Sequence, residues 1–205
     1  AHAGNWSLST GMPVYRVRGQ TLGLIGFGKI GQTVAEKARA FGLRILAYDA
    51  YISPEAIQAR GAEAVSLETL LQQADFVSLH TPLTPETRGL LNADRLRLMK
   101  PTAFVLNTAR GGLIVTDALA QAVYEGRLAG AALDVFDPEP LPADHLLWTL
   151  PNVITTPHTA FYSEESVLEL ETLAARNVAD VLSGKRPASV VNPDVLKLPR
   201  WEHLR

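Results

Sequence analysis

Short apolar runs alternate with longer amphipathic stretches along most of this chain. Each short run predicts a buried strand, and each stretch with apolar residues at helical spacing predicts a helix. The predicted strands are residues 22–25, 44–48, 62–65, 75–80, 103–107, 130–133 and 153–156, and the predicted helices are residues 33–41, a short helix from 53, and residues 66–73, 93–99, 116–125 and 163–182. This alternation predicts βαβ units, and therefore an α/β fold with a parallel sheet.

The first predicted strand leads into a turn that is rich in glycine. Gly26, Gly28 and Gly31 occupy the glycine positions of G-x-G-x-x-G in the segment Gly26-Phe27-Gly28-Lys29-Ile30-Gly31. The first glycine allows a tight turn, the second lets the backbone approach a pyrophosphate, and the third lets the helix pack closely on the strand. Unpaired N–H groups at the start of the helix favour phosphate binding. With a strand before it and a helix after it, this turn predicts a dinucleotide site.

An acidic residue follows the second predicted strand at the spacing that a dinucleotide site requires. Asp49 lies 18 residues beyond Gly31, where a carboxylate meets the adenosine ribose hydroxyls. No lysine or arginine follows in Ala50-Tyr51-Ile52-Ser53 to receive a 2′-phosphate, so the sequence favours NAD over NADP. The alternative is a structural turn followed by an Asp that caps the next helix.

Polar side chains gather at the carboxyl ends of the predicted strands, where ligands bind in open parallel sheets. Besides the glycine turn and Asp49, these ends carry His80-Thr81-Pro82, Asn107-Thr108-Ala109-Arg110, Asp134 and Thr156-Pro157-His158. We expect His80 to line the cofactor cleft rather than to perform chemistry.

Three charged residues near this edge are candidates for catalysis. Arg110 presents a guanidinium that can hold a carboxylate with two hydrogen bonds. His158 can donate a proton to a substrate oxygen, or accept one, near neutral pH. Glu139 lies between two prolines, and a hydrogen bond between it and the imidazole would orient the ring and favour its charged form. Each has an ordinary alternative: a surface pair for Arg110, a loop acid for Glu139 and a packed ring for His158.

Composition narrows the range of functions. The chain has 205 residues, which suits one full domain or one domain with an appendage, and its 47% of hydrophobic residues fits an α/β protein with a buried sheet. Its net charge of −2 gives no basic surface for nonspecific binding of nucleic acid. The lack of cysteine excludes disulfides and cysteine–metal sites, and no spacing of His, Asp or Glu indicates a metal. No apolar run is long enough to span a membrane and no signal-peptide pattern is present, so we expect a cytoplasmic protein.

Together these motifs resemble the nucleotide-binding domain of the D-isomer-specific 2-hydroxyacid dehydrogenases. The resemblance covers about residues 19–193 in the family's order. Besides the glycine turn and Asp49, it rests on Leu79-His80-Thr81-Pro82-Leu83-Thr84, Asn107-Thr108-Ala109-Arg110-Gly111-Gly112, Ala132-Leu133-Asp134-Val135-Phe136 with Glu139-Pro140, and Thr156-Pro157-His158-Thr159-Ala160. It implies a Rossmann-type, doubly wound parallel sheet of about seven strands with helices on both faces.

The resemblance also implies an oxidoreductase that transfers hydride between NAD(H) and a 2-oxo or 2-hydroxy acid. Arg110 would bind and polarise the 2-oxo acid, and His158, tuned by Glu139, would protonate its carbonyl oxygen. The residues implied in binding NAD are Gly26, Phe27, Gly28, Lys29, Ile30, Gly31, Asp49, His80, Thr81, Pro82, Thr87, Thr108, Ala109, Arg110, Asp134, His158 and Ala160. The substrate stays open among glyoxylate, hydroxypyruvate, phosphoglycerate and larger 2-oxo acids.

Two segments, residues 48–51 and 158–163, most resemble the C-terminal-binding-protein corepressor branch of the family. That branch has Trp where this chain has Phe161, a smaller aromatic residue that would reshape the substrate site. An alternative function follows: an NAD(H)-sensing, dimerising binding module, with Leu146, Leu147 and Trp148 as exposed apolar candidates, for which local packing of the loop is the other interpretation. A Rossmann protein of another chemistry is a third alternative, against which the missing Tyr-x-x-x-Lys signature and the order of Arg, Glu and His argue. The family also implies a homodimer.

Members of the family carry an N-terminal substrate domain before this region. The resemblance therefore implies that residues 1–18 are a leading linker from such a domain, that 19–186 form the NAD-binding domain, and that 187–205 form a tail returning toward the substrate domain. We expect low activity from the chain alone, because orienting and desolvating the substrate require both halves.

Overall fold

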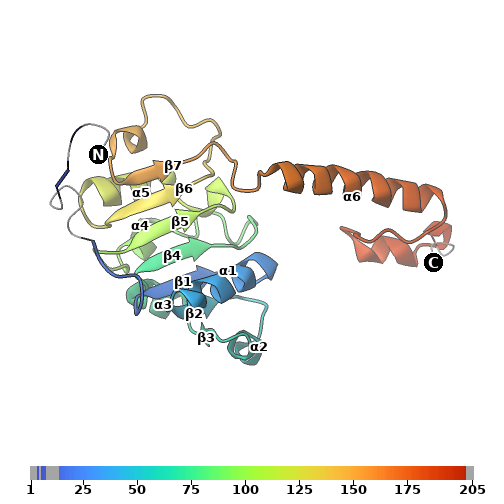
Figure 1. Cartoon of the computed structure of the whole chain (residues 1–205), viewed down its shortest axis with the longest axis horizontal. Coiled ribbons are helices and arrows are strands. Elements are labelled where there is room, and N and C mark those ends of the chain that lie inside the picture. Colours follow the sequence, from blue (N-terminus) through green and yellow to red (C-terminus); the bar gives the residue numbers. More distant parts are fainter. Residues whose placement is uncertain (1–3, 5, 8–13, 202–205) are drawn as a thin grey trace. The chain divides into compact units, whose positions relative to one another are not determined.

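The structure, a computed structural model, describes residues 4, 6, 7 and 14–201. Contacts divide the chain into two compact units, Ala1–His158 and Thr159–Arg205. The described part of the first unit forms one sheet of seven parallel strands with its helices (Figure 1).

The predicted strands and helices are all present, with bounds that differ by a few residues. The strands are β1 (Thr21–Ile25), β2 (Arg44–Tyr48), β3 (Glu63–Ala64), β4 (Phe76–Leu79), β5 (Phe104–Asn107), β6 (Gly130–Leu133) and β7 (Val153–Thr155). The α-helices are α1 (Lys29–Ala40), α2 (Pro54–Ala59), α3 (Leu67–Gln73), α4 (Ala93–Leu96), α5 (Thr116–Tyr124) and α6 (Glu164–Leu182). Short 3₁₀-helices, which the sequence pattern did not predict, are η2 (Gly111–Leu113), η3 (Leu146–Thr149), η4 (Pro193–Lys197) and η5 (Pro199–Trp201).

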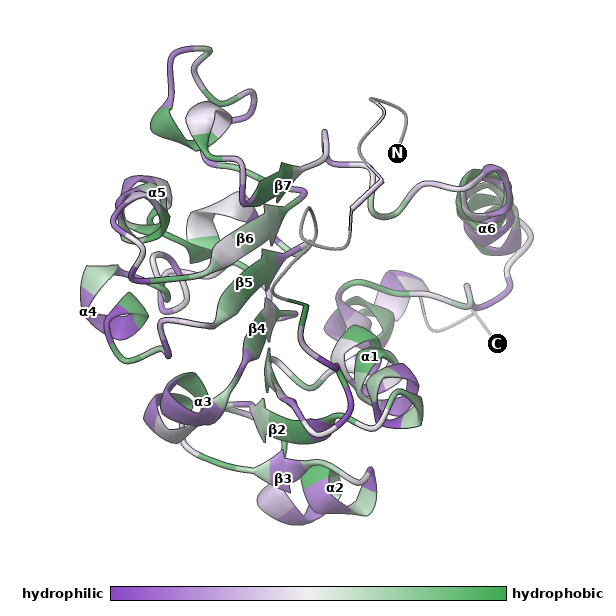
Figure 2. Ribbon diagram, turned by 60° about the vertical axis from the view of Figure 1, so that its left-hand side comes forward, coloured by the Kyte–Doolittle hydropathy of each residue, from purple (hydrophilic) through white to green (hydrophobic). Residues whose placement is uncertain are grey.

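The strand order is β3-β2-β1-β4-β5-β6-β7, and every neighbouring pair is parallel. The order reverses between β1 and β4, which is the switch point where such sheets bind ligands. Helices α3, α4 and α5 cover one face of the sheet, and α1 and α2 cover the other (Figure 2). This arrangement confirms the predicted doubly wound α/β sheet.

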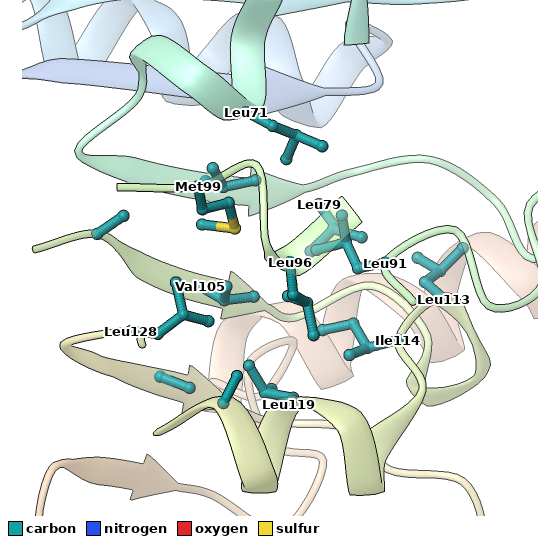
Figure 3. Packing of buried hydrophobic residues seen from close by; sticks show 14 of the residues in the cluster. Leu71, Leu79, Leu91, Leu96, Met99, Val105, Leu113, Ile114, Leu119 and Leu128 are labelled. Carbon is teal, nitrogen blue, oxygen red and sulfur yellow. The ribbon is translucent and has the colours of Figure 1, made fainter. Parts of the chain in front are cut away.

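The larger apolar core lies between the sheet and the helices α3, α4 and α5. Leu71 of α3, Leu96 of α4 and Leu119 of α5 point toward Leu79 and Val105 of the sheet (Figure 3). All five side chains are at most 1% exposed. Burial on this scale stabilises a fold by about 25 cal/mol per Å² of apolar surface removed from water, and it makes the sheet a rigid base for the loops above it.

The register of the sheet aligns the carboxyl ends of its strands. Ile25 pairs with both Tyr48 and Leu79, Leu79 pairs with Asn107, and Leu133 pairs with Thr155. The residues that follow these positions therefore lie along one edge, as predicted.

The second unit contains α6 with its N-terminal cap. The Ser163 hydroxyl accepts from the Ser166 N–H at 3.0 Å, and the Ser166 hydroxyl accepts from the Ser163 N–H at 2.8 Å. This reciprocal capping box satisfies two N–H groups and confirms Ser163 as the predicted cap.

The domain boundaries expected at residues 18/19 and 186/187 stay predictions. Residues 1–3, 5 and 8–13 of the predicted linker and 202–205 of the predicted tail lie outside the described residues. Among the residues that are described, the chain has no helix with the length and apolarity that a membrane-spanning segment needs.

Candidate active site

The turn between β1 and α1 is built from glycines with different spatial constraints. Gly26 has a φ of 93°, and a Cβ atom added to it would lie 2.6 Å from the Thr81 nitrogen. A Cβ on Gly31 would lie 2.3 Å from the Gly26 carbonyl oxygen. A Cβ on Gly28, by contrast, would meet nothing within 4 Å. Gly26 and Gly31 are therefore required by the chain's own packing, whereas Gly28 borders open space.

The open space at Gly28 lies at the N-terminus of α1. Gly28 is the N-cap residue, no side chain caps the helix there, and its first turn contains no acidic residue. The first N–H groups and the positive end of the helix dipole are thus left for an anion. These residues fit the pyrophosphate of a dinucleotide.

Asp49 follows β2 and lies beside this turn. Its Oδ2 atom accepts from the Phe27 N–H at 2.7 Å, and its Oδ1 atom accepts from the N–H groups of Tyr51 and Ile52 at 2.8 and 3.1 Å. A carboxylate has about four acceptor positions, so one remains for a ribose hydroxyl. Phe27 is fully buried in the smaller core, while Ile30 is 67% exposed.

The end of β4 carries His80, Thr81 and Pro82. Burial lowers the pKa of the His80 imidazole, and its Nε2 atom lies 2.9 Å from the Ser78 hydroxyl. The Thr87 hydroxyl donates to the Pro82 carbonyl at 2.7 Å and thereby shapes the loop after the strand. His80 is consequently neutral at pH 7, and its role in lining the cofactor cleft stays a prediction.

Arg110 lies in a loop that a buried asparagine holds in place. Asn107, 1% exposed, donates from Nδ2 to the Arg110 carbonyl at 2.9 Å and accepts from the Ala109 N–H at 3.0 Å. The exposed Arg110 guanidinium donates to the Ala109 carbonyl at 2.6 Å. Asn107 was not among the predicted site residues, although its place at a strand end beside Arg110 was a signal for it.

Glu139 and His158 form the hydrogen bond that the sequence analysis expected. Oε2 of Glu139 lies 2.9 Å from Nδ1 of His158, and Oε1 accepts from the Phe136 N–H at 2.8 Å. The bonds from His158 and then from Phe136 hold the pKa of the Glu139 carboxyl below its usual range. Glu139 is therefore ionised at neutral pH and can stabilise a positive charge on the ring.

The backbone of His158 is unusual. Its φ is 54°, and among the described residues it alone combines a side chain with a positive φ. Its N–H donates to the carbonyl of Asp134 at 2.8 Å. The buried Asp134 carboxylate in turn accepts from the Thr156 hydroxyl. Strained backbone of this kind is concentrated at functional sites.

One small pocket brings the three catalytic candidates together. Arg110, Glu139 and His158 line a cavity of about 210 Å³. A neighbouring cavity of about 490 Å³ is lined by Asp134, Glu139 and His158, with Trp148 on its wall. Within the described residues, no three His, Asp or Glu side chains gather as a metal-binding group.

Two predicted residues lie in the second unit. Ala160 and Phe161 are both exposed, and the Phe161 ring lies edge-on to the Tyr162 ring at 6.4 Å between centroids. Their predicted roles toward cofactor and substrate stay predictions.

Comparison with known proteins identifies the family of this chain. Residues 1–160 match the family model of the D-isomer specific 2-hydroxyacid dehydrogenase, NAD binding domain. The chain is 44% identical over 182 residues to a glyoxylate reductase of Thermococcus litoralis, covering 89% of this chain and 55% of the relative. It is 46% identical over 175 residues to a D-3-phosphoglycerate dehydrogenase of Methanocaldococcus jannaschii, covering 85% of this chain and 33% of the relative.

A solved structure gives the same result. The D-isomer specific 2-hydroxyacid dehydrogenase of Lactobacillus delbrueckii ssp. bulgaricus, in its NAD-complexed form, matches with a TM-score of 0.82 and 35% identity. The match covers 93% of this chain and 61% of that chain. The chain thus spans little more than half the length of the glyoxylate reductase and of the solved structure. It belongs to the D-isomer-specific 2-hydroxyacid dehydrogenase family, whose NAD-binding domain it carries.

Proposed function

We propose that the protein carrying this domain is an NAD-dependent D-2-hydroxyacid dehydrogenase, which interconverts a 2-oxo acid and a D-2-hydroxy acid. The observation that supports this most is the pocket lined jointly by Arg110, Glu139 and His158, with a Glu139–His158 hydrogen bond. The pocket lies at the carboxyl edge of the sheet, on the side of the dinucleotide turn.

Arg110 is proposed to hold the substrate. Its guanidinium is exposed in the pocket and bonded to a backbone carbonyl by one nitrogen. The fork of an arginine has five donors, so it can bind a carboxylate and polarise the adjacent carbonyl at the same time. The Asn107 amide fixes the backbone from which Arg110 extends.

His158 is proposed as the general acid and base. Because Nδ1 is bonded to Glu139, the other ring nitrogen, Nε2, is the atom that would give its proton to the substrate carbonyl oxygen during reduction. The ionised Glu139 stabilises the charged ring before that transfer and restricts its orientation. Oxidation of the hydroxy acid uses the same groups in reverse.

The cofactor site is proposed to consist of the turn Gly26–Gly31, Asp49 and the strand ends. The bound nicotinamide cofactor supplies or accepts the hydride. The N-terminus of α1 would hold the pyrophosphate, Asp49 the adenosine ribose, and Asp134 and His158 would border the nicotinamide. The remaining residues predicted for this site are His80, Thr81, Pro82, Thr87, Thr108, Ala109 and Ala160.

A matched pair of histidine variants tests this function. In the complete gene product, His158→Asn should lower kcat for the reduction of glyoxylate or other 2-oxo acids by about 10²–10⁴-fold. NADH affinity should stay within a few-fold. His145→Asn is the control, because His145 bonds to Asp117 and does not line the pocket of Arg110, Glu139 and His158. Turnover by His158→Asn close to that of the unaltered protein would remove the assigned role.

For the substrate we propose only a chemical class, and for the assembly and the compartment we propose the general type. Relatives named glyoxylate reductase and D-3-phosphoglycerate dehydrogenase support a short 2-oxo acid, and a panel of such acids would select among them. We infer a homodimer in the cytoplasm. Exposed apolar residues on α6, namely Leu168, Leu170, Leu173 and Val178, are the candidates for an interface.

The corepressor-like alternative receives no support from the relatives described above. Its candidate surface is also reduced, since Leu147 is 1% exposed and belongs to the larger core. The Trp148 indole donates to the Pro142 carbonyl at 2.7 Å, and its ring lies 5.7 Å from that of Phe136. NAD-dependent dimerisation without turnover of any 2-oxo acid would revive this alternative.

A further inference from the structure

The loop that carries Glu139 is joined to the loop after β4 by an ion pair. Nη1 of Arg88 donates to Oδ2 of Asp137 at 2.7 Å. Both residues line the pocket that also contains Arg110, Glu139 and His158. Asp137 is next to Phe136, whose N–H binds the Glu139 carboxylate. The ion pair therefore acts on the same turn that aims Glu139 at His158.

The Arg110 loop lies directly against this turn. A Cβ atom on Gly111 would lie 1.9 Å from the Phe136 carbonyl oxygen. A Cβ on Gly112 would lie 2.9 Å from Oδ2 of Asp137 and 3.1 Å from Nη1 of Arg88. The two glycines after Arg110 thus allow three loops to meet, and the ion pair occupies the point of contact.

Burial alone does not hold the catalytic pair in place. The side chains of His158 and Glu139 are 47% and 38% exposed. A site of this kind needs supporting contacts to keep its geometry within about 0.5 Å. The Arg88–Asp137 pair is itself half exposed, so it contributes little to global stability. Its effect is then expected on local geometry rather than on folding.

We propose that Arg88 and Asp137 are positioning residues, which fix the 136–140 turn so that Glu139 holds the His158 ring in one orientation and one tautomer beside Arg110. This inference rests on the proposed function for its catalytic meaning. The hydrogen bond at Nδ1 selects the neutral ring with its proton on Nδ1. When the turn loosens, the ring is released to the Nε2–H tautomer that free histidine prefers.

The tautomer can be measured without catalysis. ¹⁵N NMR of the neutral His158 ring should show predominantly the Nδ1–H form in the unaltered protein. Arg88→Gln should increase the Nε2–H form, and Arg88→Lys should restore most of the original spectrum. Gly112→Ala should act in the same direction as Arg88→Gln, because its methyl group would displace the ion pair.

The control is Arg97→Gln, which removes another exposed arginine–aspartate pair, the one with Asp94 on α4. It should leave the ring spectrum unchanged. In the complete gene product, Arg88→Gln should lower kcat by about tenfold or more with the KM for NADH unchanged, as expected for misaligned groups.

The outcomes separate this inference from the proposed function. An unchanged ring spectrum in both Arg88→Gln and Gly112→Ala would refute the positioning role, while 2-oxo acid reduction by the unaltered protein would still stand. A spectrum that shifts as expected in a protein that reduces no 2-oxo acid would support the anchoring of Glu139 and His158 and would refute the proposed function.

Discussion

Gly31 lies so close to Gly26 that a Cβ atom on Gly31 would stand 2.3 Å from the Gly26 carbonyl oxygen. The first turn of α1 is thereby pressed against the end of β1. A Cβ atom added to Gly28, which lies between them in the sequence, would have no other protein atom within 4 Å. The three glycines of one motif therefore serve two purposes, and substitution can separate them.

Gly31→Ala should reduce the free energy of unfolding by about 1–3 kcal/mol, because backbone atoms cannot move aside as a flexible side chain can. Gly28→Ala should cost less than about 1 kcal/mol, the usual effect at an N-cap. Gly28→Ala should nevertheless weaken NADH binding about tenfold or more, because its methyl group enters the space for the pyrophosphate. Urea unfolding and NADH fluorescence titration measure the two effects. Equal losses of stability in both variants would contradict this division.

Arg110→Lys should lower kcat/KM for 2-oxo acids by about 10–100-fold, because an ammonium group cannot reproduce a two-point contact with a carboxylate. The dissociation constant of NADH should change little. Steady-state kinetics on the complete gene product measures the effect. Arg127→Lys, at a surface pair with Glu125, is the matched control. Equal kcat/KM values for the two variants would exclude Arg110 from substrate binding.

Asp49→Asn should narrow the preference for NADH over NADPH. A carboxylate at the ribose repels a 2′-phosphate, and the amide removes that repulsion while it keeps one oxygen for the backbone N–H groups of Phe27 or Tyr51. The ratio of the two dissociation constants should move toward NADPH by about tenfold, which corresponds to about 1.4 kcal/mol. Asp117→Asn, at an exposed position, should leave the ratio unchanged.

His80 should make stability depend on pH. Its pKa is lowered by burial, so the unfolded chain takes up a proton first as the pH falls below about 6.5. The neutral ring therefore contributes to the free energy of unfolding above that pH, and this contribution is lost as the pH falls through the lower pKa of the folded state. Unfolding free energies at about pH 7.5 and 5.5 should differ less in His80→Gln than in the unaltered protein. If the two proteins showed the same difference in unfolding free energy between these pH values, the burial of His80 would have no effect on the pH dependence of stability.

The sequence pattern predicted the sheet because parallel strands are buried on both faces and appear as apolar runs. The run at 22–25 lies within β1, whose five residues are all buried. β3 was predicted longer than it is, since only Glu63 and Ala64 pair with β2. The 3₁₀-helices, such as η2 after Arg110, are too short to show a periodic pattern of apolar residues.

The sequence was sufficient to predict those parts of the candidate site in which one residue type indicates the chemistry. Glu139 and His158 were expected to bond, and they do. The hydrogen bond from Asn107 to the Arg110 carbonyl was not predicted, because it depends on the exact path of the loop. The Arg88–Asp137 ion pair was not predicted either, because it forms where two loops far apart in the sequence meet. The spacing of residues along the chain carries little information about contacts between distant loops. The ends of parallel strands, in contrast, lie side by side wherever such a sheet forms.

The left-handed backbone of His158 limits how its replacements can be interpreted. Asparagine and glycine adopt that conformation readily, but a β-branched residue would incur strain of about 1–3 kcal/mol and relax it by moving. Because the His158 N–H is bonded to the Asp134 carbonyl, such a shift would spread to the neighbouring strand end. In a saturation library, inactivity of valine or isoleucine at this position would therefore report distorted architecture, and only the small, permissive replacements would isolate the loss of the acid.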